Sequence, residues 1–328
     1  MKVIVTGGAG FIGTNLLIHL LKQGNYQVFC LDSLTYASNN FYKKLQDENP
    51  GNFNFLKIDI ASFKDVEHAM HKICPDRIMH LAAESHVDNS ISRPDLFLKT
   101  NILGTFNLLE SVRTYLSNEK KDNFLFHHIS TDEVYGDLNI DDDPFDESSP
   151  YRPSSPYSAS KASSDHLVRA WSRTYGIPSI ITNCSNNFGP FQNKEKFIPQ
   201  IILNLLRGKQ VSIYGDGTNI RDWLYVKDHV EALEVCMRKG VSGETYNIGG
   251  NHEMQNIDLF NLISSEVAMI LGKDEKQFKN LVSFVKDRPG HDKRYAINME
   301  KIKNSLAWHP KYNFSSALKE TIQWYIDN

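Results

Sequence analysis

Two short segments of the chain carry side chains suited to proton transfer. Thr131, Asp132 and Glu133 close an apolar run, and Tyr157 stands four residues before Lys161. Positions four apart share one face of a helix, so Lys161 can reach the ligand that Tyr157 approaches, and its charge should lower the pKa of the phenol. A phenolate placed in this way is a plausible base for the oxidation of an alcohol.

The adjacent carboxyl groups of Asp132 and Glu133 suggest a second proton-transfer set. They can divide the roles of acid and base if their environments hold their pKa values apart. The same triplet is also suitable as an N-cap followed by a solvated turn, and the sequence leaves both interpretations open. It does not show which carboxyl group is protonated at rest.

A glycine-rich segment near the N-terminus predicts a dinucleotide site. In the stretch TGGAGFIG of residues 6–13, Gly7 allows a tight turn, Gly10 lets the backbone approach a pyrophosphate, and Gly13 permits close packing of helix and strand. The helix N-terminus then offers N–H groups to the phosphates. Asp32 ends the next strand, about twenty residues on, where its carboxylate can bind a ribose and would repel a 2′-phosphate. The predicted cofactor is therefore NAD.

The elements that position these residues alternate between strand and helix in the first half of the chain. This alternation predicts an α/β fold, a Rossmann-type doubly wound parallel sheet, followed by a smaller, irregular α/β domain. We assign residues 1–185 to NAD binding and residues 186–328 mainly to the substrate, with segments around 224–250 returning to the first domain. The predicted strands are 2–6, 27–32, 54–57, 77–81, 124–130, 177–184 and 244–248. The predicted helices are 12–23, 65–72, 94–116, 158–175, 197–206, 226–238 and 259–271.

Composition excludes several classes of partner. The chain has 328 residues and a net charge of −3, which gives no general attraction for nucleic acid or an anionic membrane. A strand and a glycine loop stand where a signal peptide would be, and no apolar run approaches the roughly 18 residues of a membrane span. The four cysteines lack metal-like spacing. We expect a cytoplasmic protein without a metal site.

The motifs resemble those of known enzymes. The spacing Gly-x-x-Gly-x-x-Gly, together with Tyr157-x-x-x-Lys161, resembles the extended short-chain dehydrogenase/reductase family along essentially the whole chain. Five segments are also similar to the nucleoside-diphosphate-hexose 4,6-dehydratases, above all those that act on dTDP-glucose. These segments are residues 81–88, 130–136, 184–190, 221–226 and 287–295.

The resemblance implies a lyase that converts dTDP-glucose to a 4-keto-6-deoxy sugar, for the synthesis of deoxysugars such as rhamnose. It implies that Tyr157 is the base for oxidation at carbon 4 and that Thr131 hydrogen-bonds the oxygen there. Asp132 would be the acid for the departing 6-hydroxyl, and Glu133 the base at carbon 5. Lys161 would complete the catalytic set.

The resemblance also implies binding residues. Around the cofactor it places Phe11 and Ile12 in the glycine loop, Asp59 and Ile60 at the adenine, Ala82 and Ala83 along the cofactor, and Thr100 near the nicotinamide. Around the substrate it places Glu84 and Ser85 at the sugar, Asn187 and Lys196 in contact with the substrate, Tyr214 and Asn256 near the nucleoside, and His291 and Tyr295 near the phosphates or base.

Two arginines are candidates for the diphosphate because a guanidinium matches phosphate oxygens in a bidentate fork. They are Arg221 and Arg288, although Arg221, which precedes Asp222, could equally form a structural ion pair. Three positions depart from the family pattern: Asn183 replaces a usual arginine, and Phe188 and Phe191 replace usual tyrosines. These changes remove polar tips rather than catalytic groups.

Other functions remain alternatives. One is a nucleotide-sugar 4-epimerase or decarboxylase of the same superfamily, or a 4,6-dehydratase for another nucleoside-diphosphate sugar. Another is an NAD-sensing binding protein, which the intact Thr131, Tyr157 and Lys161 argue against. The helices 94–116 and 158–175 resemble those of a dimer contact in this family and predict a homodimer, although one chain could also bury their apolar faces.

Overall fold

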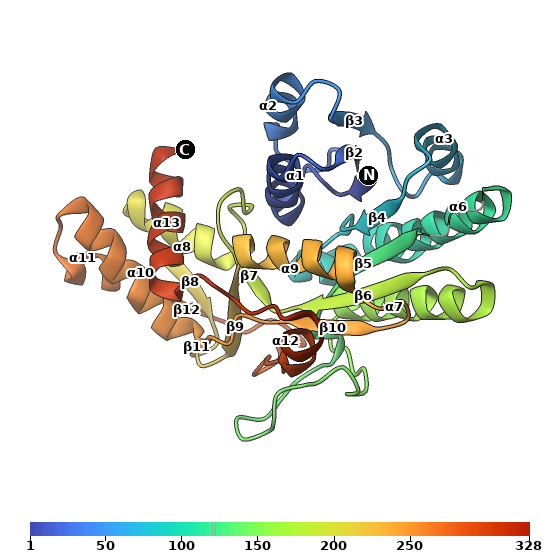
Figure 1. Cartoon of the computed structure of the whole chain (residues 1–328). Coiled ribbons are helices and arrows are strands. Elements are labelled where there is room, and N and C mark those ends of the chain that lie inside the picture. The colour runs from blue at the N-terminus through green and yellow to red at the C-terminus, as the bar shows by residue number, and fades with distance from the viewer. Residues whose placement is uncertain (120, 122) are drawn as a thin grey trace.

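A seven-stranded parallel sheet forms the centre of the computed structural model, which describes residues 1–119, 121 and 123–328 (Figure 1). Its strand order is β10-β6-β5-β4-β1-β2-β3. This order confirms the predicted Rossmann-type sheet. The strands are β1 (Lys2–Thr6), β2 (Gln27–Asp32), β3 (Phe53–Lys57), β4 (Arg77–His80), β5 (Leu125–Thr131), β6 (Ser179–Cys184) and β10 (Thr245–Ile248).

Helices cover both faces of this sheet, as expected for strands that are apolar on both sides. On one face α1 (Phe11–Gln23) packs against α9 (Val226–Lys239). On the other face α6 (Gly104–Asn118) packs against α3 (Phe63–Ile73) and α7 (Pro156–Tyr175). Each face has its own cluster of buried apolar side chains. Shorter helices α2 (Phe41–Glu48), α4 (Val87–Ser92) and α5 (Pro94–Phe97) complete this half.

The second half, apart from α9 and β10, forms a smaller body beside the carboxyl end of the sheet (Figure 1). It contains a three-stranded sheet of order β11-β9-β7 and a two-stranded sheet of β12 and β8. The core around α1 and α9 continues into this body through α8, α10 and α13. Its strands are β7 (Asn186–Phe188), β8 (Val211–Tyr214), β9 (Ile220–Tyr225), β11 (Glu253–Gln255) and β12 (Val282–Val285). Its helices are α8 (Phe197–Leu206), α10 (Asn256–Leu271), α11 (Glu275–Lys279), α12 (Glu300–Leu306) and α13 (Phe314–Asp327).

The segment predicted as one helix over residues 94–116 differs from that expectation. It is α5, then a π-helical segment η1 (Leu98–Leu103), then α6. The wide turn holds the buried Asn101, whose side-chain amide bonds the backbone of Glu84 at 2.8 and 3.0 Å and Ser160 Oγ at 2.8 Å. Such π-turns are frequent at functional sites, and this one joins the segment after β4 to α7.

Over residues 1–119, 121 and 123–328, the structure contains no helix with the length and apolarity needed to span a membrane.

Candidate active site

The glycine loop between β1 and α1 is closely packed against its surroundings. Gly7 has a φ of 71°, a conformation that glycine adopts freely, and a Cβ there would lie 2.7 Å from the backbone of Ala82. Gly10 is the N-cap of α1 and makes no side-chain cap, so the first N–H groups of the helix are left for a ligand. These features fit the pyrophosphate of a dinucleotide.

Gly13 gives a direct test of this packing. A methyl group at Gly13 would collide with the carbonyl oxygen of Gly7 and lie 2.6 Å from the Cα of Gly8, whereas one at Gly10 would lie 3.3 Å from Gly7 O. We expect Gly13→Ala to lower the free energy of unfolding by about 1–3 kcal/mol, the usual cost of overpacking, and to abolish NAD binding. Urea unfolding of cofactor-free protein measures the first effect, with Gly10→Ala as the milder matched variant. Equal stability of Gly13→Ala and the unmodified protein would contradict this prediction.

Asp32 lies at the end of β2, beside the glycine loop. Its carboxylate accepts hydrogen bonds from the backbone N–H of Ala9 at 2.9 Å and of Leu34 at 2.8 Å, and from Ser38 Oγ at 3.1 Å. The side chain therefore fixes the loop on which it borders. Oδ1 accepts two of these bonds and Oδ2 only one, so Oδ2 keeps capacity for a further donor, such as a ribose hydroxyl.

The catalytic candidates come from two adjacent elements, β5 and α7. Thr131 is the last residue of β5, and Asp132 and Glu133 begin the short 3-10 helix η2 (Asp132–Val134). Thr131 Oγ1 accepts the backbone N–H of Glu133 at 3.3 Å and donates to Asp132 Oδ1 at 3.3 Å, so the threonine is the cap, while Asp132 Oδ2 and the carboxyl group of Glu133 remain available. The two interpretations of the triplet are therefore compatible, because Thr131 caps η2 while Asp132 and Glu133 line the cleft as an acid/base pair.

The two carboxyl groups have different surroundings. Burial raises the pKa of Asp132 well above its usual range, and the carboxylates of Glu133 and Asp222 raise it further. Burial also raises the pKa of Glu133, but Arg288, Arg221 and Lys196 oppose this effect. Asp132 Oδ2 is buried and has no hydrogen-bond partner among the described residues. Asp132 is therefore the better candidate for the protonated acid, and Glu133 for the ionised base.

Burial of Asp132 has a consequence for stability. Because its pKa is raised in the folded protein, its contribution to stability falls as the pH rises through and above the usual carboxyl range. Asn cannot ionise, so we expect Asp132→Asn to raise the free energy of unfolding by about 1 kcal/mol near neutral pH, while dehydration is lost. At acid pH the gain should disappear.

Urea unfolding over a pH series measures this gain, with the exposed Asp65→Asn on α3 as the charge-matched control. A variant that is no more stable than the unmodified protein at neutral pH would argue that Asp132 is not held in a costly environment.

Tyr157 and Lys161 lie near the start of α7, which has well-defined ends. Ser155 and Ser158 form a reciprocal capping box, Pro156 occupies the first turn, and Gly176 ends the helix in the left-handed conformation. These signals place Tyr157 one residue inside the helix, beside Thr131, and Lys161 one turn further on.

The expected effect of Lys161 on Tyr157 is not what the structure shows. Burial raises the pKa of Tyr157 well above its usual value, and the Glu133 carboxylate raises it further, while a hydrogen bond with Thr131 opposes the rise. Lys161 Nζ instead donates to the carbonyl oxygen of Ile129 at 2.8 Å. The prediction of a lowered pKa was wrong for these surroundings because helix spacing reveals proximity but not burial.

One cleft of about 430 Å³ joins the predicted cofactor and catalytic residues. Every predicted cofactor and catalytic residue lines it, and so do four predicted substrate residues. The cofactor group is Gly7, Gly10, Phe11, Ile12, Gly13, Asp32, Asp59, Ile60, Ala82, Ala83, Thr100, Tyr157 and Lys161. The others are Thr131, Asp132, Glu133, Glu84, Ser85, Asn187 and Lys196.

The remaining predicted substrate residues lie outside the lining of that cleft. They are Tyr214, Arg221, Asn256, Arg288, His291 and Tyr295. Tyr214 OH and an Arg288 nitrogen both contact the carboxylate of Asp88 on α4, at 3.0 and 3.3 Å. Lys196 Nζ donates to Ser85 O at 2.7 Å. Side chains of the smaller body therefore reach the edge of the sheet domain at residues 85–88.

Arg221 is held by the backbone more than expected for a phosphate ligand. Its guanidinium donates to the carbonyl oxygens of Ile220, Asp292 and Lys293 and lies 4.4 Å from the ring centre of Tyr295. No ion pair with Asp222 is formed, because that carboxylate accepts the N–H groups of Gly250 and His252. Arg221 keeps two of its five donors free of these bonds.

The other outer residues are also engaged. His291 Nδ1 lies 2.6 Å from an Asp287 oxygen, and its ring meets that of Tyr214 at 6.0 Å. Tyr295 OH donates to Asp292. Asn256 begins α10, and its backbone N–H donates to Asn219 O at 3.0 Å.

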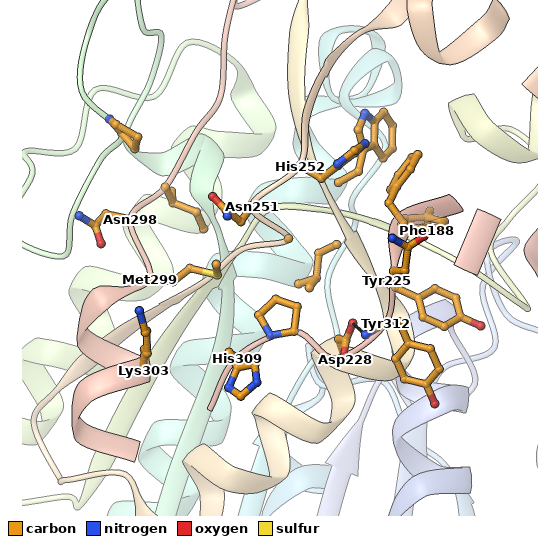
Figure 2. A pocket seen from close by; sticks show the side chains of 18 of the residues that line it. Phe188, Tyr225, Asp228, Asn251, His252, Asn298, Met299, Lys303, His309 and Tyr312 are labelled. Carbon is orange, nitrogen blue, oxygen red and sulfur yellow. Dashed lines mark hydrogen bonds between the residues drawn. The ribbon is translucent and has the colours of Figure 1, made fainter. Parts of the chain in front are cut away.

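A larger cavity, of about 700 Å³, lies elsewhere and contains none of the predicted site residues. In Figure 2, Phe188 and Tyr225 lie on one side of it and Met299 and Lys303 on the other. The carboxylate of Asp228 in its wall accepts the backbone N–H groups of Lys311 and Tyr312, so it attaches the C-terminal segment to α9. The cleft, rather than this cavity, holds the chemical groups.

The chain is similar to known proteins along its whole length. The family model described as GDP-mannose 4,6 dehydratase matches residues 4–321. A dTDP-glucose 4,6-dehydratase from Neisseria meningitidis is 51% identical over 333 residues, covering 100% of this chain and 94% of that protein.

Two solved structures are also similar. A double mutant of dTDP-glucose 4,6-dehydratase from Streptomyces venezuelae, solved with NAD bound, has a TM-score of 0.91 and 39% identity over 100% of this chain and 98% of that one. A UDP-glucose 4-epimerase from Thermotoga maritima has a TM-score of 0.86 and 29% identity over 100% and 99%.

The parallel sheet, the glycine loop and the tyrosine–lysine pair on α7 define a short-chain dehydrogenase/reductase of the extended type. Among such proteins, the comparisons give a closer assignment. The chain belongs to the family of dTDP-glucose 4,6-dehydratases. The resemblance drawn from the five sequence segments is confirmed.

Proposed function

We propose that the protein is an NAD-dependent dTDP-glucose 4,6-dehydratase, a hydro-lyase that forms dTDP-4-keto-6-deoxyglucose. The observation that carries this proposal is the buried Asp132 next to the partly buried Glu133, both beside Tyr157, in surroundings that favour an acid at Asp132 and a base at Glu133. An epimerase needs the hydroxyl, tyrosine and lysine but has no step that requires such a pair. The 51% identity to a dehydratase, against 29% to an epimerase structure, supports the same choice.

The residues of the cleft divide the reaction as follows. The glycine loop and Asp32 would hold NAD, which would supply an acceptor for the hydride of carbon 4 and a donor of that hydride to carbon 6. Tyr157 takes the proton of the 4-hydroxyl, and Thr131 bonds the oxygen at that carbon. Glu133 removes the proton at carbon 5, which the neighbouring ketone makes acidic, and Asp132 protonates the 6-hydroxyl as it departs as water. The protonated Glu133 then returns a proton to carbon 5 when hydride is added at carbon 6.

Burial of Tyr157 requires that its proton transfer be assisted. The positive charge of Lys161 and a hydrogen bond with Thr131 favour the phenolate form of Tyr157. Tyr157 would therefore act as a base when both groups and the substrate are in place. The nucleoside of the substrate would lie toward Tyr214 and Asn256, and Arg221 and Arg288 would bind the diphosphate. His291 and Tyr295 would lie near the phosphates or base, Glu84 and Ser85 at the sugar, and Asn187 and Lys196 would also contact the substrate. Residues 1–185 would bind the cofactor and residues 186–328 mainly the substrate.

We propose further that the enzyme is a homodimer through η1, α6 and α7. Apolar side chains are exposed there, with Leu98 at 55%, Leu103 at 45% and Tyr175 at 51%. Large apolar side chains exposed on neighbouring helices fit an interface between subunits. Sedimentation at low concentration tests this proposal, and a monomer would oppose it.

The setting of the enzyme is also a proposal. The four cysteines are unpaired thiols, which fits a reducing compartment such as the cytoplasm. The keto sugar would supply the synthesis of a deoxysugar such as rhamnose.

A substrate panel tests the proposed function. Purified protein is incubated with dTDP-, UDP-, GDP- and CDP-glucose, and the keto sugar formed is measured. We expect dTDP-glucose to be the preferred substrate. Keto sugar from another nucleotide alone would assign a related dehydratase, an epimerised sugar without loss of water would assign the epimerase alternative, and no conversion would oppose both.

A further inference from the structure

Four side chains of α7 occur at intervals of four residues: Tyr157, Lys161, Asp165 and Arg169. Positions so spaced lie one above another on the same face of a helix. The exposed fractions of Tyr157, Lys161 and Asp165 are 9%, 4% and 0%. A carboxylate buried this completely is costly unless it is paired and hydrogen-bonded.

Strand β5 holds Lys161 and Asp165 through neighbouring residues. Lys161 Nζ donates to Ile129 O at 2.8 Å, and Ser130 Oγ donates to Asp165 Oδ2 at 3.0 Å. His128 Nε2 lies 3.1 Å from the other oxygen of Asp165. The end of β5 that carries Thr131 is thus attached to α7 by the lysine and by the aspartate one turn later.

The outer side of Asp165 is also bonded. Tyr151 OH donates to Asp165 Oδ2 at 2.8 Å, and Tyr151 OH accepts an Arg169 N–H at 2.8 Å. Asn183, which replaces a usual arginine of the family, donates to the same hydroxyl at 3.3 Å. Asp165 therefore lies between two cations. Lys161 is buried beside the cleft, and Arg169 is connected to Asp165 through the hydroxyl of Tyr151.

Among the groups around Lys161 and Asp165, the Asp165 carboxylate is the one that supplies a negative charge to Lys161. Burial lowers the pKa of His128 to about 4 and raises that of Cys184 to about 12, so both are neutral at neutral pH. Burial works to raise the pKa of Asp165, but His128, Lys161 and Ser130 leave it below its usual range. Several titratable or charged groups face Lys161 and Asp165. From the sheet they are His80 on β4, His128 on β5 and Cys184 on β6. From the helix side they are Tyr157 and Arg169 on α7, Tyr151 in the loop before it and Tyr135 after η2.

Lys161 needs such a counter-charge. Burial lowers its pKa, and the first group to oppose this is the Asp165 carboxylate. Since a neutral lysine would neither attract a phenolate nor donate all three of its hydrogens, its protonation matters for the chemistry of Tyr157.

We propose that Asp165 is a positioning residue that keeps Lys161 protonated and aligned with Tyr157, and that Ser130 and Tyr151 fix Asp165 for this purpose. This inference rests on the proposed function, because it takes Lys161 to serve the oxidation at carbon 4. Asp165 itself does not line the cleft.

Asp165→Asn tests the proposal, because it removes the charge and nearly preserves the shape. Without the carboxylate, Lys161 loses its proton at lower pH. The alkaline limb of kcat/KM should therefore move to lower pH by about 1–3 units, the usual effect of one close charge. NAD affinity of cofactor-free protein, titrated over the same pH range, should show the same displacement.

A matched control separates this charge from others. The exposed Asp65→Asn on α3 also removes one carboxylate and should leave both limbs in place, whereas Ser130→Ala, which removes one donor that fixes Asp165, should give a smaller displacement in the same direction. A folded Asp165→Asn protein with both limbs at the unmodified pH would overturn the proposal.

If Asp165→Asn does not fold, Tyr151→Phe removes the bond to Asp165 and its link to Arg169. Tyr151→Phe should move the alkaline limb in the same direction by a smaller amount. A Tyr151→Phe protein whose alkaline limb does not move would likewise overturn the proposal. Protein that does not convert dTDP-glucose would refute the proposed function, while the pH dependence of NAD affinity would still decide the role of Asp165.

Discussion

Glu133→Gln should lower formation of the keto-deoxy sugar by about 10²–10⁴-fold, the contribution of a well-placed acid or base. Glutamine cannot accept the proton at carbon 5, although it keeps the size of the side chain. Burial raises the pKa of Glu133, and three cations, Arg288, Arg221 and Lys196, oppose this rise and favour the ionised form that a base needs. The oxidation at carbon 4 does not use this group and should persist.

Two readouts distinguish these steps. Single-turnover mixing with dTDP-glucose should still change the near-ultraviolet absorbance of the bound nicotinamide, while keto-deoxy product is nearly absent. Glu119→Gln, an exposed carboxylate at the end of α6, is the matched control and should behave like the unmodified protein. Unchanged formation of the keto-deoxy sugar by Glu133→Gln would show that another group is the base at carbon 5.

Tyr157→Phe should remove the oxidation itself. The phenol is the proposed base at carbon 4, so we expect a fall in kcat of about 10²–10⁴-fold together with loss of the nicotinamide absorbance change. The side chain is buried and its ring packs against Phe97 at 6.3 Å, so phenylalanine should keep the fold. Both half-reactions are lost in this variant, in contrast to Glu133→Gln.

Tyr115→Phe is the control for this change. Tyr115 is also buried on a helix, and its hydroxyl donates to Pro75 O at 3.3 Å, away from the cleft. It should show a small loss of stability and full activity. A Tyr157→Phe protein that still changes the nicotinamide absorbance at the unmodified rate would show that another group is the base.

The sheet was predictable because its strands are short apolar runs between turn signals. The predicted strands 2–6 and 27–32 coincide with β1 and β2, and the helix 197–206 coincides with α8. Strand β9 contains the buried Arg221 and Asp222, which interrupt the apolar pattern, and β7 and β11 have only three residues each. Such strands are fixed by tertiary contacts rather than by local periodicity.

The site was predictable where it depends on the ends of parallel strands. Side chains that follow the strands converge at one edge of the sheet, so the glycine loop, Asp32 and Thr131 line one cleft. Asn101, Asp88 and Asp165 were not predictable, because each acts through partners distant in the sequence. Burial is equally invisible in the sequence, and it decides the pKa direction of Tyr157 and the division of roles between Asp132 and Glu133.

The central claim is that one active site removes hydride from carbon 4, eliminates water and returns the hydride to carbon 6. Incubation with dTDP-glucose carrying deuterium at carbon 4, followed by mass spectrometry and NMR, tests it most directly. We predict a product lighter by one water, with a ketone at carbon 4 and the deuterium at carbon 6. A product of unchanged mass with deuterium still at carbon 4, or no conversion at all, would contradict the account.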